Sequence, residues 1–125
     1  MGALVELAYW IIAGLLAAFY LYGGGIKVIQ SRERLLPMMG WVDRVPMPLV
    51  RTIGVLEVLG AAGLILPPLL GIAPGLAIAA AIGLVLIQAG GITVHVSRGE
   101  ARQIGLNIGL LVAAAVAAWL ATTWL

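Results

Sequence analysis

The sequence predicts an all-α membrane protein, built as a bundle of four transmembrane helices. The 125 residues are 63% hydrophobic and only 10% charged, with a mean hydropathy of +1.16, whereas soluble domains carry about 25% charged residues. Four apolar segments also reach the length that a bilayer requires, roughly 20 residues at about 1.5 Å of rise each. We therefore expect one membrane domain over 1–125, with helices at about 4–27, 50–66, 74–95 and 103–125.

The first helix carries no charge between Leu7 and Ile26, and no basic residue precedes it. Without a basic stretch before the apolar one, a cleaved signal peptide is not expected, so this helix should remain in the protein. The second helix contains the run TIGVLEVLGAAGLIL, with a single carboxylate, Glu57, near its middle. Prolines and glycines end that helix because they interrupt helical hydrogen bonding; they are Pro67, Pro68, Gly71, Pro74 and Gly75.

The third helix begins near Pro74, and the short connection before it predicts that helices two and three are antiparallel neighbours. The fourth ends with Trp119 and Trp124, which suit the membrane interface. The loop 32–49 is too long for a tight turn and too apolar for a free linker. We expect a short interfacial segment there, with Trp41 at the level of the lipid headgroups. A second interpretation is that this loop covers a pocket on the same side.

The basic residues predict the orientation of the chain. All seven lie in the two loops that follow helices one and three or at the ends of those loops, namely Lys27, Arg32, Arg34, Arg44, Arg51, Arg98 and Arg102. The positive-inside tendency then places both loops in the cytoplasm and both termini outside it. The basic isoelectric point reflects this distribution, and no extended basic stripe indicates a nucleic-acid partner.

Polar residues inside the spans lie at one depth. Glu57 is six residues, or roughly 9 Å, from Arg51 at the cytoplasmic edge, and Gln88 and Asn107 fall in the same half of their helices. We therefore predict a polar pocket open toward the cytoplasm. Its candidate ligand-binding residues are Glu57, Asn107, Gln88, Lys27, Tyr20 and His95.

A structural interpretation stands beside the pocket. Buried polar groups often join helices, so Glu57 could be hydrogen-bonded to Asn107 or Gln88 and bind nothing, although an ionisable residue within a membrane is by default a functional candidate. Lys27, at the end of its span, could instead extend to lipid phosphate. His95 could be a solvated residue of the interface.

Several chemistries find no support in the sequence. It has no cysteine and one histidine, so no metal centre is expected. Ser, His and Asp show no nucleophile motif, and GGGIK lacks the context of a phosphate-binding loop. We expect no catalytic residue and no intrinsic cofactor, so any redox role depends on chemistry from elsewhere.

The blocks GGGIKV, GWV, IGVLEVLGAAGLILP and HVSRGE, followed by Asn107, resemble the DoxX-like family of small four-helix bacterial membrane proteins. That family is named for its similarity to the membrane subunit of a thiosulfate:quinone oxidoreductase. The resemblance implies a location in the bacterial inner membrane and an accessory role in a quinone-linked complex. The implied partners are membrane lipid and other membrane or membrane-associated proteins, or further copies of the chain.

Three functions follow from these observations. The first is an accessory subunit that acts through protein partners, with the polar cluster joining the helices. The second is binding of a quinone or a similar small amphiphile, with Glu57 and Asn107 holding the head group. The third is transport of a proton or small solute, for which Glu57 is the only support, since no inverted repeat of broken helices is present.

Overall fold

The computed structural model describes residues 2–125 and confirms the all-α fold. Its four long helices are α1 (Gly2–Ile29), α3 (Met47–Leu70), α4 (Leu76–Ser97) and α5 (Gly105–Leu120). The short elements are α2 (Arg32–Leu35) and the 3₁₀ turns η1 (Gly40–Asp43), η2 (Ala101–Gln103) and η3 (Ala121–Trp124). Each long helix, with η3 continuing α5, is apolar and long enough to cross a membrane. The chain is therefore a multi-pass membrane protein.

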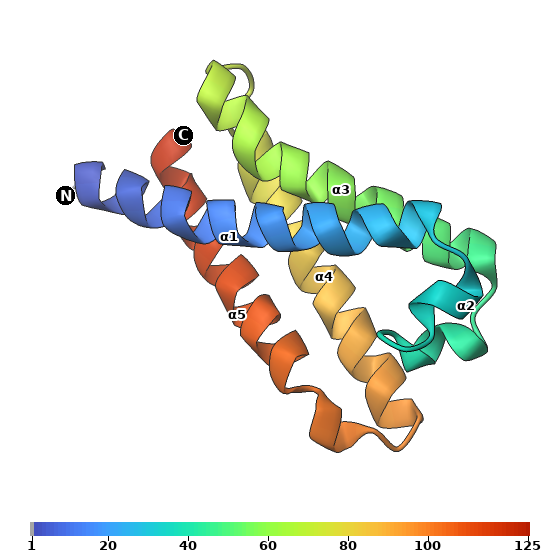
Figure 1. Ribbon diagram of the computed structural model, residues 1–125. Coiled ribbons are helices and arrows are strands. Elements are labelled where there is room, and N and C mark those ends of the chain that lie inside the picture. The colour runs from blue at the N-terminus through green and yellow to red at the C-terminus, as the bar shows by residue number, and fades with distance from the viewer. Residues whose placement is uncertain (1) are drawn as a thin grey trace.

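The long helices form a closed ring in which α1 packs on α3, α3 on α4, α4 on α5 and α5 back on α1 (Figure 1). Both termini and the α3–α4 turn lie at one end of the bundle. There the ring of Trp124 meets those of Tyr9 and Trp10 at centroid distances of 5.5 Å. The two charged loops meet at the opposite end, where Arg98 contacts Asp43. Trp124 is thus packed within the bundle, while Trp119 is exposed.

Helix α3 is longer than predicted, because it continues through both prolines to Leu70. A proline at position i cannot donate to the carbonyl of i−4, so Pro68 leaves the carbonyl oxygen of Leu64 without its helical partner. The hydroxyl of Tyr9 donates to that oxygen at 2.6 Å. Helix α3 ends only at Gly71, whose left-handed φ of 68° and N–H bond to the Pro67 carbonyl close the last turn.

The other boundaries move by a few residues. Helix α4 runs from 76 to 97 rather than from 74 to 95, and α5 begins at Gly105 rather than at Gln103. Residues 101–103 form the turn η2, so Gln103 precedes α5 and does not share a continuous helical face with Asn107.

Small residues bring the helices together. A Cβ atom on Gly24 or on Gly54 would lie 2.7 Å from the carbonyl oxygen of the other, so the backbones of α1 and α3 touch at this crossing. Helices α3 and α4 approach in the same way, since a Cβ on Gly63 would lie 2.8 Å from that of Ala80. Close approach through small residues is how helices pack in lipid, where apolar side chains have no preference for one another over acyl chains.

The main core occupies the half of the bundle that holds the termini. Helix α5 contributes Ala114, Ala117 and Leu120 to it, whereas residues 105–113 of that helix bury no side chain. The half near the charged loops is therefore more open on the α5 side.

The loop 32–49 folds into a compact unit. Leu35, Val42 and Val50 are fully buried and form a second, smaller core. The guanidinium of Arg32 donates to the carbonyl oxygens of Val42 and Asp43, which fixes η1 against α2. This loop is thus an ordered part of the protein rather than a flexible connection.

Candidate functional site

The centre of the site is an ion pair between α1 and α3. Lys27 Nζ lies 2.5 Å from Glu57 Oε1, and the residues are 9% and 2% exposed. The glycine crossing positions them, because a Cβ on Gly54 would lie 2.8 Å from the Cβ of Lys27, and one on Gly24 3.0 Å from that of Glu57. Lys27 therefore points into the bundle instead of toward lipid phosphate.

The start of α3 is fastened to the end of α1 beside this pair. Arg51 Nη1 donates to the carbonyl oxygens of Lys27 and Gln30, at 2.8 and 2.5 Å. These carbonyls belong to the last turn of α1 and the residue after it, where helical donors are missing. A charged side chain thus holds the two helix ends together at the level of the ion pair.

A second set of polar side chains crosses the middle of the bundle. Gln88 Nε2 donates to the hydroxyl of Tyr20 at 2.6 Å, and Gln88 Oε1 accepts from Asn107 Nδ2 at 2.9 Å. Gly91 makes room for this bond, since a Cβ there would lie 2.9 Å from Asn107 Nδ2. Glu57 is therefore bonded to Lys27 rather than to Gln88 or Asn107. Gln88 and Asn107 are hydrogen-bonded to each other instead.

Two cavities, of about 300 and 430 Å³, meet at these residues. The smaller is completed by α3 and α4, and the larger by α1, α5 and the loop. Both are lined by Lys27, Trp41, Glu57, Gln88, His95 and Asn107. Five of the six candidate residues thus line common space; the sixth, Tyr20, is fully buried behind Gln88 and lines neither cavity.

Trp41 is a part of this wall that the sequence did not identify. It belongs to η1, in the loop, and it lines both cavities rather than lying only at headgroup level. Met38, Met39 and Gly40 beside it line the larger cavity. The loop thus covers the polar site, as the second interpretation of it required. The length and apolar composition of the loop were the only features of the sequence that indicated this position.

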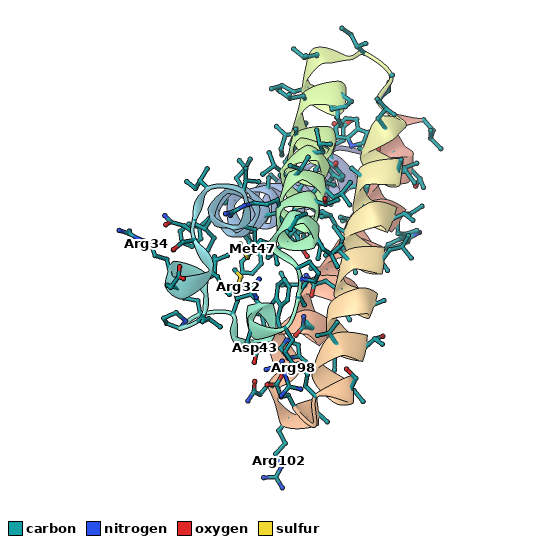
Figure 2. All side chains as sticks on the ribbon, turned by 90° about the vertical axis from the view of Figure 1, so that its right-hand side faces the viewer. Arg32, Arg34, Asp43, Met47, Arg98 and Arg102 are labelled. Atoms are coloured by element: carbon teal, nitrogen blue, oxygen red, sulfur yellow. The ribbon has the colours of Figure 1, made fainter. Side chains whose placement is uncertain are left out.

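The loop is fastened to the end of α4 by Arg98, which Figure 2 shows beside Asp43. Arg98 Nη1 donates to Asp43 Oδ1 at 2.8 Å, and Arg98 Nε donates to Glu100 Oε1 at 3.0 Å. The hydrogen bond from Arg98 holds the pKa of the Asp43 carboxyl below its ordinary value. By contrast, Arg34 and Arg102 extend away from the bundle in the same view.

His95 lies at the cavity wall on the same helix end. Its Nδ1 is 2.9 Å from Glu100 Oε1, and this hydrogen bond, followed by that from Arg98, lowers the pKa of Glu100. In the neutral imidazole, Nδ1 would donate to Glu100 and leave Nε2 as an acceptor. Within residues 2–125, no three His, Cys, Asp or Glu side chains are grouped so that they could hold a metal ion.

The site has hydrogen-bond donors and an acceptor that the described residues leave unused, a chemistry that matches an uncharged group able both to donate and to accept. An ammonium has three N–H donors, and one of those on Lys27 is used by Glu57. The second carboxylate oxygen, Glu57 Oε2, has no donor among the described residues. Because the two charges compensate each other, a charged ligand would leave one of them unbalanced in a medium where that is costly.

Comparison with known proteins places the chain in a family. The family model described as the DoxX-like family matches residues 11–118, which includes every residue of the site. No curated protein and no solved structure matches the chain.

Proposed function

Since the chain belongs to the DoxX-like family, we propose that it is a membrane subunit whose polar site binds the head group of a quinone or a similar small amphiphile. The buried Lys27–Glu57 pair at the junction of two cavities is the observation that supports this most directly. Small-molecule sites are mostly apolar spaces of about 300–1,000 Å³ with a few convergent polar groups.

The Lys27–Glu57 pair alone would serve equally as a tie between helices. Ties in membrane bundles, however, need no unfilled space around them, and here the pair, the amide of Gln88 and the amide of Asn107 all line the cavities. A carbonyl of a quinone could accept from Lys27 or Asn107, and a quinol hydroxyl could donate to Glu57 Oε2. The site therefore suits both redox forms of such a head group.

The same resemblance supports an accessory role. With no cysteine and one histidine in the sequence, we propose that electrons reach a bound quinone through a partner protein in the membrane. A partner of this kind would be retained when the chain is purified in a mild detergent after cross-linking in native membranes. Recovery of the chain without any oxidoreductase component would contradict the accessory role and leave ligand binding standing.

The charged loops, with Arg98 and the covered site, are proposed to face the cytoplasm, because basic residues favour that side. A reporter that is active only in the periplasm should then be active when fused after Leu125. Activity of the same reporter inserted in the loop 32–49, with silence at Leu125, would reverse the orientation.

The binding proposal is tested with purified protein in lipid nanodiscs and decylubiquinone as the probe. Glu57→Gln preserves the shape of the side chain and its acceptor for Lys27 but removes the charge, and Glu6→Gln removes an exposed carboxylate at the other end of the bundle. We expect the wild type and Glu6→Gln to retain the quinone, and Glu57→Gln to lose it while still folded, at a lower thermal stability because the buried Lys27 ammonium loses its counter-charge. Equal retention by all three proteins would refute the proposal.

If Glu57→Gln does not fold, Asn107→Ala provides the same measurement. Asn107 is only half-buried and is joined to the bundle by one hydrogen bond, to Gln88, so its loss should be tolerated. An affinity of Asn107→Ala for the quinone equal to that of the wild type would also count against the site.

A further inference from the structure

The bundle is open between α1 and α5 at the level of the polar site. At this level α3 buries Val50, Gly54 and Glu57, and α4 buries Gln88. Residues 105–113 of α5 bury no side chain. Figure 1 shows α1 and α5 diverging from the end that holds the termini toward the end that holds α2.

The larger cavity lies in this opening and reaches the surface that faces lipid. Its walls on the two helices include Phe19 and Tyr22 of α1 and Leu106 and Leu110 of α5. Phe19, Tyr22 and Leu106 are 41%, 64% and 64% exposed, so the same side chains line the cavity and contact the surroundings. The cavity therefore extends from exposed side chains of two membrane-spanning helices to the buried ion pair, and Met38, Met39, Gly40, Glu100 and Gln103 line it on the side of the charged loops.

The wall of this opening changes in chemistry along its length. Lys27 and Glu57 lie at its inner end, and aromatic and leucine side chains lie at its outer end. A molecule that fills it must be polar where it meets the ion pair and apolar where it meets lipid. An apolar tail that leaves the protein between the exposed side chains of α1 and α5 emerges beside two apolar spans, which hydrocarbon surrounds in a bilayer.

We propose that the space between α1 and α5 is a lateral portal, through which a single-tailed amphiphile passes its head group from the bilayer to the Lys27–Glu57 pair and in which its tail remains. This inference rests on the proposed function and adds to it the class of ligand and its route. The occupant is the tail of the bound ligand, in preference to a helix of a second copy or the acyl chain of a bulk lipid.

The test compares two quinone probes that share a head group, one carrying a decyl tail and one carrying no tail, in nanodiscs. Leu106→Trp and Leu110→Trp narrow the portal, and Val112→Trp places the same side chain on an exposed position of α5 that lines neither cavity. We expect the portal variants to weaken binding of the tailed probe at least about tenfold, which is 1.4 kcal/mol, and to leave the tailless probe unaffected. Val112→Trp should bind both probes normally.

The outcomes separate the two proposals. If the wild type binds neither probe, the proposed function fails. If the wild type binds both and the portal variants bind the tailed probe as well as Val112→Trp does, head-group binding stands and the portal is wrong. Equal loss of binding of both probes in folded portal variants would also overturn the portal. The introduced indole would then act by distorting the head-group site and not by blocking the tail.

A second copy of the chain is tested as the occupant through cysteine chemistry. The sequence contains no cysteine, so Leu106→Cys introduces a single thiol at the outer wall of the portal. Oxidation in native membranes should yield monomer only. Efficient disulfide-linked dimers at this position, absent for Val112→Cys, would show that a neighbouring copy fills the space and would overturn the proposal.

Discussion

The Lys27–Glu57 pair gives the sharpest test of the structure, through a double-mutant cycle with Glu57→Leu and Lys27→Met. Either change alone leaves a charge that is at most 9% exposed without its partner, and breaking a buried pair in this way costs about 3–5 kcal/mol of the free energy of unfolding. Replacing both residues by apolar ones removes both desolvation costs, so the double variant should be close to the wild type in stability or above it. The expected coupling energy is therefore about 3 kcal/mol or more.

The assay is reversible unfolding in mixed detergent and SDS micelles, followed by circular dichroism, for the four proteins of the cycle. Binding of decylubiquinone is measured on the same samples. We expect a double variant that is folded and stable but binds no quinone, which would separate the structural role of the pair from its proposed role in binding. Additive losses, with the double variant as unstable as the sum of the two single ones, would refute the pairing of Lys27 with Glu57.

Three further changes test other contacts. Gly54→Ala should destabilise the bundle by about 1–3 kcal/mol, because its Cβ would lie 2.7 Å from the backbone oxygen of Gly24 and 2.8 Å from the Cβ of Lys27, and neither atom can move without shifting α1. Gly83→Ala, with nothing within 4 Å of its Cβ, should leave the stability unchanged, and equal unfolding curves for the two variants would contradict the crossing. Tyr9→Phe leaves the buried carbonyl oxygen that faces it without a donor and should cost about 1–3 kcal/mol, whereas an unchanged midpoint of unfolding would show that the bond is absent. The hydrogen bond from Arg98 lowers the pKa of Asp43. The Arg98–Asp43 pair therefore stabilises the loop fully at a pH above the ordinary pKa of Asp43, and this stabilisation is lost as the pH falls through the lowered pKa. The fluorescence of the loop tryptophan, with the other three replaced by phenylalanine, should thus be constant from pH 7 to about 4 and change below it; Asp43→Asn should abolish that transition, and a transition centred near pH 6 would contradict the assignment.

Hydropathy and charge were sufficient for the fold class and for the number of spanning helices, because the bilayer restricts both length and composition. They were not sufficient for the end of α3. Pro67 and Pro68 read as helix breakers, and the helix continues through them because Tyr9, 55 residues away in sequence, satisfies an acceptor that a proline leaves free. A contact of that kind has no local signature.

The site shows the same division. The depth of a residue and the face on which it lies are properties of a single helix. They were sufficient to predict that Glu57, Gln88, Asn107 and Lys27 lie at one depth in the bundle. Which of these residues bond to which depends on how each helix is rotated about its axis and how closely it approaches its neighbour. The crossing of Gly24 and Gly54 decides this for α1 and α3, and it pairs Glu57 with Lys27.

The position of Trp41 follows neither from hydropathy and charge nor from depth and helical face. It depends on the fold of the loop, which is set by the small core around Val42 and by the bonds of Arg32 and Arg98. These contacts join segments that are unrelated in sequence pattern.

The glycine crossing has a mechanical consequence. Because the backbones of α1 and α3 touch and are held by Lys27, Glu57 and Arg51, those two helices must move as one rigid half. Helix α5 buries side chains only in its alanine-rich half, near Ala114 and Ala117, and its other half is joined to α4 by the hydrogen bond from Asn107 to Gln88. The charged pair thus belongs entirely to the unit formed by α1 and α3, and its geometry does not depend on where α5 lies.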